Sequence, residues 1–218
     1  MSCLARHFYL NNIEYSKGEN KMGSILQSLQ RTIIAGVVLL VLIIAAVTTL
    51  TGNAIAFDHA WGAFVMRWLH VLVGVMWIGL LWYFNFVQIP SMPKIPDEQK
   101  PAISKVIAPT ALFWFRYAAL FTVLTGLSLA GANGYLVEAL TLQRPVLAIG
   151  IGMWLAIVMA FNVWFIIWPN QKKALGIVQV EAAEKAAAAR LAMLTSRFNT
   201  MFSIPMLYMM VAQQNGGL

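Results

Sequence analysis

Two groups of polar side chains interrupt the long apolar stretches of this 218-residue sequence. The first group consists of Asp58, His59, Arg67 and His70. Arg67 and His70 are three residues apart, so they share one face if this stretch is helical. Polar and ionisable groups inside a membrane are costly, which makes them candidates for function. We therefore treat this first group as a candidate functional cluster.

The second group lies near the opposite ends of the same apolar stretches and contains amides and one arginine. Its members are Asn85, Gln88, Arg116, Asn162 and Asn199. Four predicted helices bring these groups to one depth, where they either bind a ligand or hold helices together through hydrogen bonds. Such interhelical bonds contribute on average about 0.6 kcal/mol each.

His70 is the only histidine inside an apolar stretch, and it is therefore a candidate axial ligand of haem. Haem in a helical bundle takes axial ligands from facing helices. No second such histidine exists, so the partner would be Met206, Met209 or Met210. The alternative is a His70 that only hydrogen-bonds inside the bundle. We predict no cofactor as the default, with haem b on His70 as the alternative, and no metal site. The sequence has no Cys-x-x-Cys-His motif for c-type haem, no zinc cluster and no phosphate loop.

The elements that position these residues are membrane-spanning helices. Hydrophobic residues make up 60% of the chain and charged residues only 11%, against roughly a quarter in soluble domains. Uncharged stretches of the required length, about 20 residues, recur along the chain. They predict an all-α bundle with five transmembrane helices, at about 32–50, 62–88, 109–131, 146–168 and 198–211, in one domain over 32–218.

The distribution of charge predicts the orientation of the bundle. The net charge is +7, and a cytoplasmic N-terminus with a periplasmic C-terminus places only Arg67 and Arg144 outside. The thirteen other cations fall on the cytoplasmic side: Arg6, Lys17, Lys21, Arg31, Lys94, Lys100, Lys105, Arg116, Lys172, Lys173, Lys185, Arg190 and Arg197. This bias follows the positive-inside rule and removes the need for a nucleic-acid partner. We expect a bacterial inner-membrane protein.

The segments between the spans carry their own signals. Residues 1–31 form a polar N-terminal segment, and Met22 is an alternative start. Pro90, Pro93 and Pro96 predict an extended connection after the second span, and Pro169 predicts the end of the fourth. The charged, Ala-rich stretch 171–196 predicts a cytoplasmic helix or an extension of the fifth span beyond the membrane.

Four stretches in order resemble the membrane domain of bacterial membrane-bound urate hydroxylases, the urate oxidase N-terminal domain family. They are Arg67-Trp68-Leu69-His70 with Gly74 and Trp77-Ile78-Gly79; Leu112 to Ala118 with Gly126; Met159 to Val163 with Pro169-Asn170-Gln171-Lys172; and Ser196-Arg197-Phe198-Asn199 with Pro205. The resemblance implies a helical membrane scaffold and urate-type oxidoreductase chemistry. Family members typically have histidine at Phe113 and Phe198, an acid near Ala118, further spans and a C-terminal cytochrome c domain.

These departures affect the reaction more than the fold, because Phe and Ala neither carry protons nor ligate metals. We therefore predict an accessory subunit of a larger membrane complex for electron transfer, with the lipid bilayer and other membrane subunits as partners. The second hypothesis is an oxidoreductase of urate or a related purine that passes electrons to a periplasmic cytochrome c. The third is a small-molecule transporter, against which the spans show no inverted repeat and no acid.

Overall fold

The computed structural model describes residues 21–217 and divides the chain into two compact units, 1–56 and 57–218. Most of the polar segment 1–31 lies outside the described residues. The prediction that Met22 is an alternative start therefore remains a prediction. The first unit contains α2 (Lys21–Leu26) and α3 (Leu29–Thr51). α3 buries none of its residues within the unit and ends at Gly52, whose φ of 67° is left-handed. Its apolar surface on all sides suits lipid.

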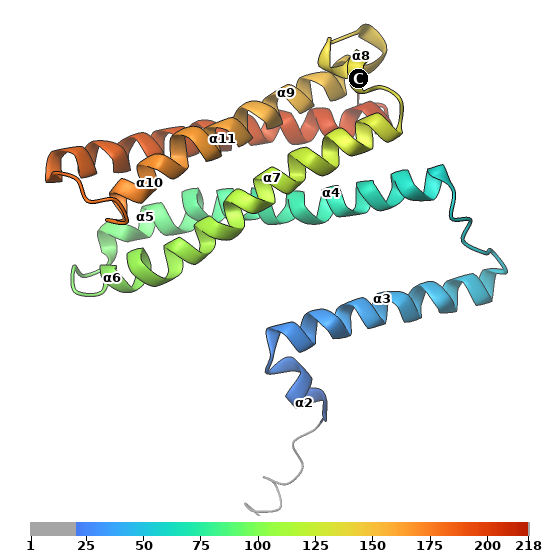
Figure 1. The fold of residues 1–218 in the computed structure, drawn as a ribbon, viewed down its shortest axis with the longest axis horizontal. Helices are drawn as coiled ribbons and strands as arrows, with labels where there is room; N and C mark the ends of the chain where they lie inside the picture. Colours follow the sequence, from blue (N-terminus) through green and yellow to red (C-terminus); the bar gives the residue numbers. More distant parts are fainter. Residues whose placement is uncertain (1–20, 218) are drawn as a thin grey trace, which may run out of the picture. The chain divides into compact units, whose positions relative to one another are not determined.

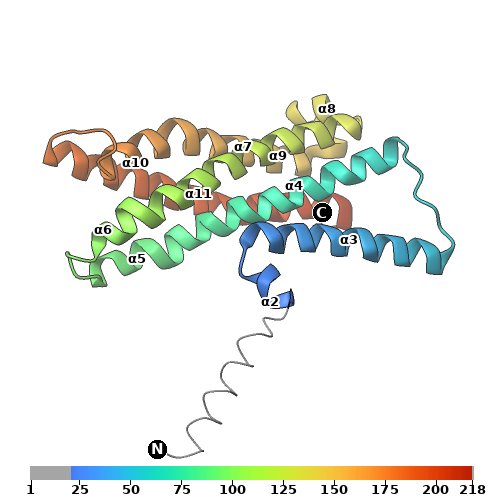
Figure 2. The same cartoon turned by 60° about the horizontal axis from the view of Figure 1, so that its bottom comes forward.

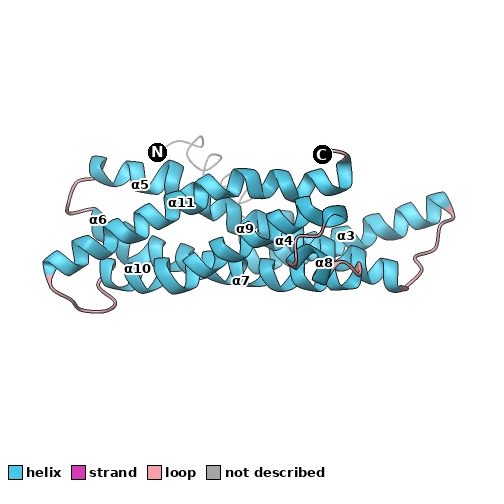
Figure 3. Cartoon of the chain, turned by 90° about the horizontal axis from the view of Figure 1, so that it is seen from above, coloured by secondary structure: helices cyan, strands magenta, loops and turns pink. Residues whose placement is uncertain are grey.

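The second unit is built from four long helices, shown in Figure 1. These are α4 (His59–Trp82), α7 (Ala108–Ala132), α9 (Leu147–Phe161) and α11 (Ala182–Asn215). Short helices extend or connect them: α5 (Ile89–Ser91), α6 (Lys100–Ala102), α8 (Leu136–Leu140) and α10 (Trp168–Ala174). Figure 3 shows helices and loops throughout the described part, so the predicted all-α class is confirmed.

Within this unit α4 packs mainly against α7, and α9 packs mainly against α11. Figure 2 shows the four helices running side by side along the length of the unit. The fully buried core is aromatic and aliphatic, with Trp77, Leu81, Phe115, Met159 and Val163 at its centre. We call the end where α4 begins, α7 ends and α11 ends the C-terminal end of the bundle. The end with α5, α6 and α10 is the opposite end.

Four helical segments within residues 21–217 are long and apolar enough to cross a membrane: Leu29–Thr51, His59–Lys94, Lys100–Ala132 and Arg144–Ala174. The length and apolar composition of these four segments therefore indicate a membrane protein. α11, which contains the predicted fifth span, does not meet the same criterion although it has 34 residues. The orientation and the fifth span remain predictions.

The prolines do not end helices as the sequence predicted. The second span continues through α5 and a 3₁₀ turn to Lys94, so the extended connection expected at Pro90 and Pro93 is wrong. The fourth span likewise continues past Pro169 to Ala174. Residues 182–215 form a single helix, which corresponds to the predicted extension of the fifth span rather than to a separate helix.

A π turn before each of these prolines explains the continuity. The π segments are Tyr83–Gln88, Ile103–Ile107 and Asn162–Ile167, and Pro90, Pro109 and Pro169 each lie two residues after the end of one of them. The intervening residue donates its N–H to the carbonyl five positions back: Ile89 to Phe84, Ala108 to Ile103 and Trp168 to Val163. Widening the turn makes room for the proline ring, which otherwise clashes with the preceding turn.

Candidate functional site

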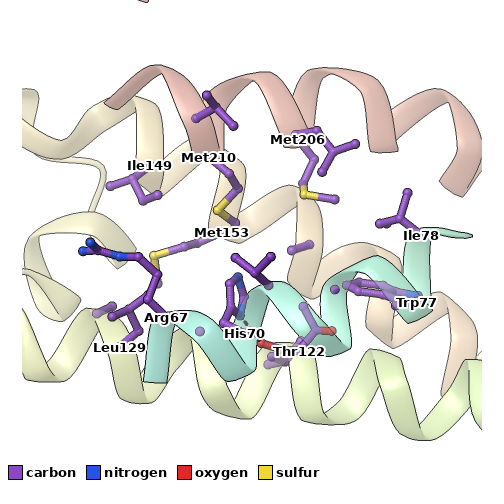
Figure 4. Close-up of a pocket in the computed structure, with 18 of the residues that line it drawn as sticks. Arg67, His70, Trp77, Ile78, Thr122, Leu129, Ile149, Met153, Met206 and Met210 are labelled. Atoms are coloured by element: carbon purple, nitrogen blue, oxygen red, sulfur yellow. Dashed lines mark hydrogen bonds between the residues drawn. The ribbon is translucent and has the colours of Figure 1, made fainter. Parts of the chain in front are cut away.

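A cavity of about 540 Å³ opens in the C-terminal half of the bundle, between α4, α7, α9 and α11. This volume is within the range of small-molecule and cofactor sites. Its walls are mainly apolar, and Arg67 and His70 are the titratable groups from α4 that line it. Figure 4 shows both side chains in the space below α9 and α11. The predicted pair therefore shares one cavity.

His70 is held in one orientation by α7. Its Nδ1 lies 2.9 Å from the backbone carbonyl of Thr122 and 3.3 Å from the hydroxyl of Thr125. A carbonyl only accepts, so Nδ1 carries the proton and donates to it. Nε2 then keeps its lone pair, and no described residue bonds it. A neutral imidazole fixed through Nδ1–H is the usual state of a metal-ligating histidine.

Gly126 on α7 leaves the space that the His70 ring occupies. A Cβ built at Gly126 would lie 2.8 Å from Cε1 and 3.1 Å from Nδ1 of His70. Real Cβ contacts are not this short, so any side chain at 126 displaces the ring. The Nδ1–Cε1 edge of the imidazole therefore lies close to the backbone of the neighbouring helix, which the missing side chain of glycine permits.

Methionines from the other two helices face the histidine. Met153 of α9 and Met206 and Met210 of α11 line the same cavity, with their thioethers on the side opposite α4 in Figure 4. Met153 and Met206 are buried, and Met210 is half-buried. Of the methionines named from the sequence, Met209 does not line this cavity, although both Met209 and Met210 pack against Gly152 on α9. Met206 and Met210 are thus the α11 thioethers placed to pair with His70.

Arg67 supplies a positive charge at the C-terminal end of the cavity. Among the described residues no acid lies within salt-bridge distance of it. Tyr135 lines the same cavity next to it. Burial raises the pKa of the Tyr135 phenol, although the charge of Arg67 partly counteracts this shift. The phenol is therefore neutral at physiological pH, and Arg67 is left to bind an anionic group.

The two other residues of this first group have structural positions. Asp58 is the N-cap of α4 and accepts a hydrogen bond of 2.9 Å from the amide of Trp61. His59 Nε2 lies 2.6 Å from the carbonyl of Ala132, at the end of α7. Both residues fix the start of α4, and neither lines the cavity.

The second polar group does not form one site. Asn162 donates to the side-chain oxygen of Asn199 at 2.8 Å, and Asn199 donates to the Met159 carbonyl at 2.9 Å. Asn85 donates to Ser196 at 2.8 Å, which joins α11 to the π turn after α4. These bonds connect helices, as one of the two hypotheses for this group expected.

The other two members are separate from that network. Gln88 lines a small cavity of about 50 Å³ together with Gln171 and Ser196, and its side-chain oxygen is buried without a donor. This space is of the order of one or two water molecules. Arg116 stacks on Trp168 and makes no hydrogen bond through its buried Nε and Nη1.

We expect Asn199→Leu to destabilise the bundle by about 1–2 kcal/mol, because it leaves the buried Asn162 amide without its acceptor. Asn199 is fully buried. The measurement is thermal unfolding of the purified protein in detergent. Asn215→Leu is the matched control, since Asn215 is exposed and bonds only within α11. Equal melting temperatures for the two variants would contradict a structural role for the amide pair.

Sequence reasoning gave no role to several groups around His70, although Gly126 and Ser196 belong to the stretches that resemble the family. Thr122, Gly126 and Met153 are apolar or weakly polar residues of ordinary helices, and only the packing of α7 and α9 brings them to the cavity. Ser196 and Ser203 were missed for the same reason, although both are buried and accept bonds from other helices. The i, i+4 spacing of Met206 and Met210 was the one usable signal.

One comparison with known proteins gives a match. The model of the urate oxidase N-terminal family matches residues 135–216. This confirms the resemblance over α8 to α11, which form two walls of the cavity. The matched segment contains two of the four resembling stretches, those at 159–172 and 196–205. No curated protein and no solved structure matches the chain.

The positions at which this chain departs from the family pattern lie away from the cavity. Phe113 and Phe198 are exposed on the surface of the second unit, and Phe198 stacks on Phe202 with ring centroids 4.1 Å apart. Ala118 is buried in the core. None of the three lines the cavity around His70.

Proposed function

We propose that this chain is a haem-bearing membrane subunit of an electron-transfer complex, with haem b held in the cavity between α4 and α11. The observation that carries the proposal is the state of His70. Its Nδ1 is fixed by Thr122, its Nε2 is unbonded, and it lines a 540 Å³ apolar cavity with Met206 and Met210. Histidine with methionine is a known axial pair for electron-transfer haem.

The rest of the cavity agrees with this ligand. Apolar walls suit the macrocycle, and the unpaired guanidinium of Arg67 suits a propionate carboxylate. Bound haem supplies one-electron redox chemistry. The chain contributes a neutral imidazole in fixed orientation, a soft thioether, and a low-dielectric environment that limits access of water. These are the means by which a protein sets a reduction potential.

The test is a reduced-minus-oxidised optical spectrum of the gently purified protein, with a haem assay and a list of co-purifying chains. We expect about one haem b per chain, and at least a tenfold loss of haem in His70→Ala, because a metal ligand is removed. His59→Ala is the matched control, since His59 lies outside the cavity. Haem retained by His70→Ala, or a wild type that takes up no haem when it is supplied, would exclude the proposal.

A second candidate function is oxidation of urate or a related purine, with electrons passed to a separate cytochrome c. The family match is the observation that favours it, since the matched helices α9 and α11 wall the same cavity. Arg67 and His70 would then contact the purine anion. Urate-dependent reduction of a cytochrome by membranes carrying this chain, lost in His70→Ala, would support it. Membranes that reduce cytochrome equally well without urate would argue against it.

The accessory role in a complex rests on separate observations. The surface of α3 is apolar on every side, and several large side chains of α4 outside the cavity are exposed, including Phe64, Trp68 and Leu72. Such surfaces suit lipid or neighbouring subunits. Co-purification of a stoichiometric partner under mild detergent supports this role, and a stable lone monomer with full activity would contradict it.

A further inference from the structure

Arg116 is a buried cation without an acceptor. Its side chain belongs to α7, in the half of the bundle away from the His70 cavity, and only 9% of the residue is exposed. Both Nε and Nη1 are buried, and neither has a hydrogen-bond partner. No acid forms a salt bridge with it among the described residues. Buried charges in proteins are normally paired, so this guanidinium lacks a counter-ion.

The surroundings of Arg116 hold it in place but do not neutralise it. Its Cζ lies 3.4 Å from the centre of the Trp168 ring and 6.0 Å from that of Trp164. Stacking on an indole face orients the guanidinium plane, and the in-plane N–H groups of the buried Nε and Nη1 keep their hydrogen-bonding capacity unused. The tryptophans therefore position the donors for a ligand.

Two further donors belong to the same tryptophan pair or lie near it. Trp164 Nε1 is a third buried donor that has no acceptor. Lys172 Nζ lies 5.7 Å from the centre of the Trp168 ring and forms no salt bridge with any described acid. Two cations thus lie near the Trp168 ring, further buried donors are unused, and no acid of the described residues forms a salt bridge with either cation.

From this arrangement we propose that Arg116, Trp164 and Lys172 form a site for an oxyanion, a phosphate group. Arginine recognises phosphate through paired N–H donors, and lysine adds a point charge. In a membrane protein the phosphate comes from the headgroup of an anionic phospholipid or from free phosphate in solution. The site is independent of haem, since it lies on other residues than those lining the His70 cavity.

The experiment compares the two sources on the full-length protein. Native mass spectrometry counts phosphatidylglycerol retained after detergent washing, and thermal shifts are recorded with inorganic phosphate. We expect Arg116→Gln to weaken binding of one of these two ligands at least tenfold. Retained phosphatidylglycerol identifies a headgroup, and a phosphate-dependent shift without retained lipid identifies the free ion.

Three further variants keep the test decisive. Trp164→Phe removes only the Nε1 donor and keeps the ring, and Lys172→Gln removes the second charge at a partly exposed position. Both should weaken binding severalfold, even if Arg116→Gln does not fold. Arg197→Gln is the control, because Arg197 is exposed and outside this group. If neither ligand distinguishes the wild type from Trp164→Phe and Lys172→Gln, the proposal is wrong.

Discussion

Gly126→Val is expected to reduce binding of the proposed haem by about tenfold to a hundredfold, although His70 is the only proposed ligand that a side chain at 126 would contact. A Cβ at this position would lie 2.8 Å from Cε1 of His70. The ring must therefore swing away from α7, and its 2.9 Å bond to the Thr122 carbonyl breaks. Loss of the group that orients a ligating histidine typically costs this much affinity. Haem titration of the purified variant, followed in the optical spectrum, measures the effect.

Gly62→Val is the matched control for this substitution. Gly62 also lies in a helix, α4, but it does not line the cavity, and a Cβ built there meets nothing within 4 Å. The haem affinity of this variant should stay close to that of the wild type. If Gly126→Val binds haem as tightly as Gly62→Val does, the fixed orientation of His70 is irrelevant to the cofactor.

The second large effect is expected at Gly150, near the start of α9. A Cβ at this position would collide with the backbone carbonyl of Ala139 in α8 and would lie 3.1 Å from Leu142 Cδ2. A backbone group cannot move aside as a side-chain tip can, so α8 and α9 must separate. We expect Gly150→Val to destabilise the protein by about 3 kcal/mol, the upper end for overpacked cores. Thermal unfolding in detergent measures it.

Gly131→Val shows whether the effect is specific to the contact between α8 and α9. Gly131 lies near the end of α7, and the nearest atom to a Cβ built there is Leu136 Cδ2 at 4.0 Å. This variant should lose less than about 1 kcal/mol, the range of propensity effects in helices. Similar melting temperatures for both variants would mean that α8 does not pack on α9 as the structure has it.

The sequence was sufficient for the class of fold because the signal is long and simple. Apolar stretches of about 20 residues can only be helices in lipid, and the structure is helical throughout its described part. The breaks were harder to predict. Pro90 and Pro169 indicate helix ends in soluble proteins, whereas here a widened turn before each proline preserves the helix. The π turn depends on packing against neighbouring helices, so the residues next to the proline do not predict it.

The candidate site was predictable only in part, for a similar reason. Arg67 and His70 are polar residues in an apolar stretch, so they can be identified from the sequence. Their spacing of three predicts that they share one face of the helix, and both line the cavity. The amides were also visible, but which of them pair depends on the packing of α9 against α11. Nothing in the sequence around Gly126 or Thr122 indicates that they hold a histidine 52 to 56 residues earlier.

The three π turns give the two halves of the bundle different stiffness. All three precede prolines near the opposite end, where a widened turn lacks part of the regular i to i−4 ladder and bends more readily. The helical segments around His70, by contrast, are regular in α4 and α7. Thermal motion should therefore concentrate in the half that contains Arg116 and Trp168. Around the cavity, α4 and α7 should keep His70 in a fixed position, whereas α11 contains Pro205 next to Met206 and should be the wall of the cavity that bends most readily. A ligand held between them would therefore have a rigid histidine on one side and a more adaptable thioether on the other.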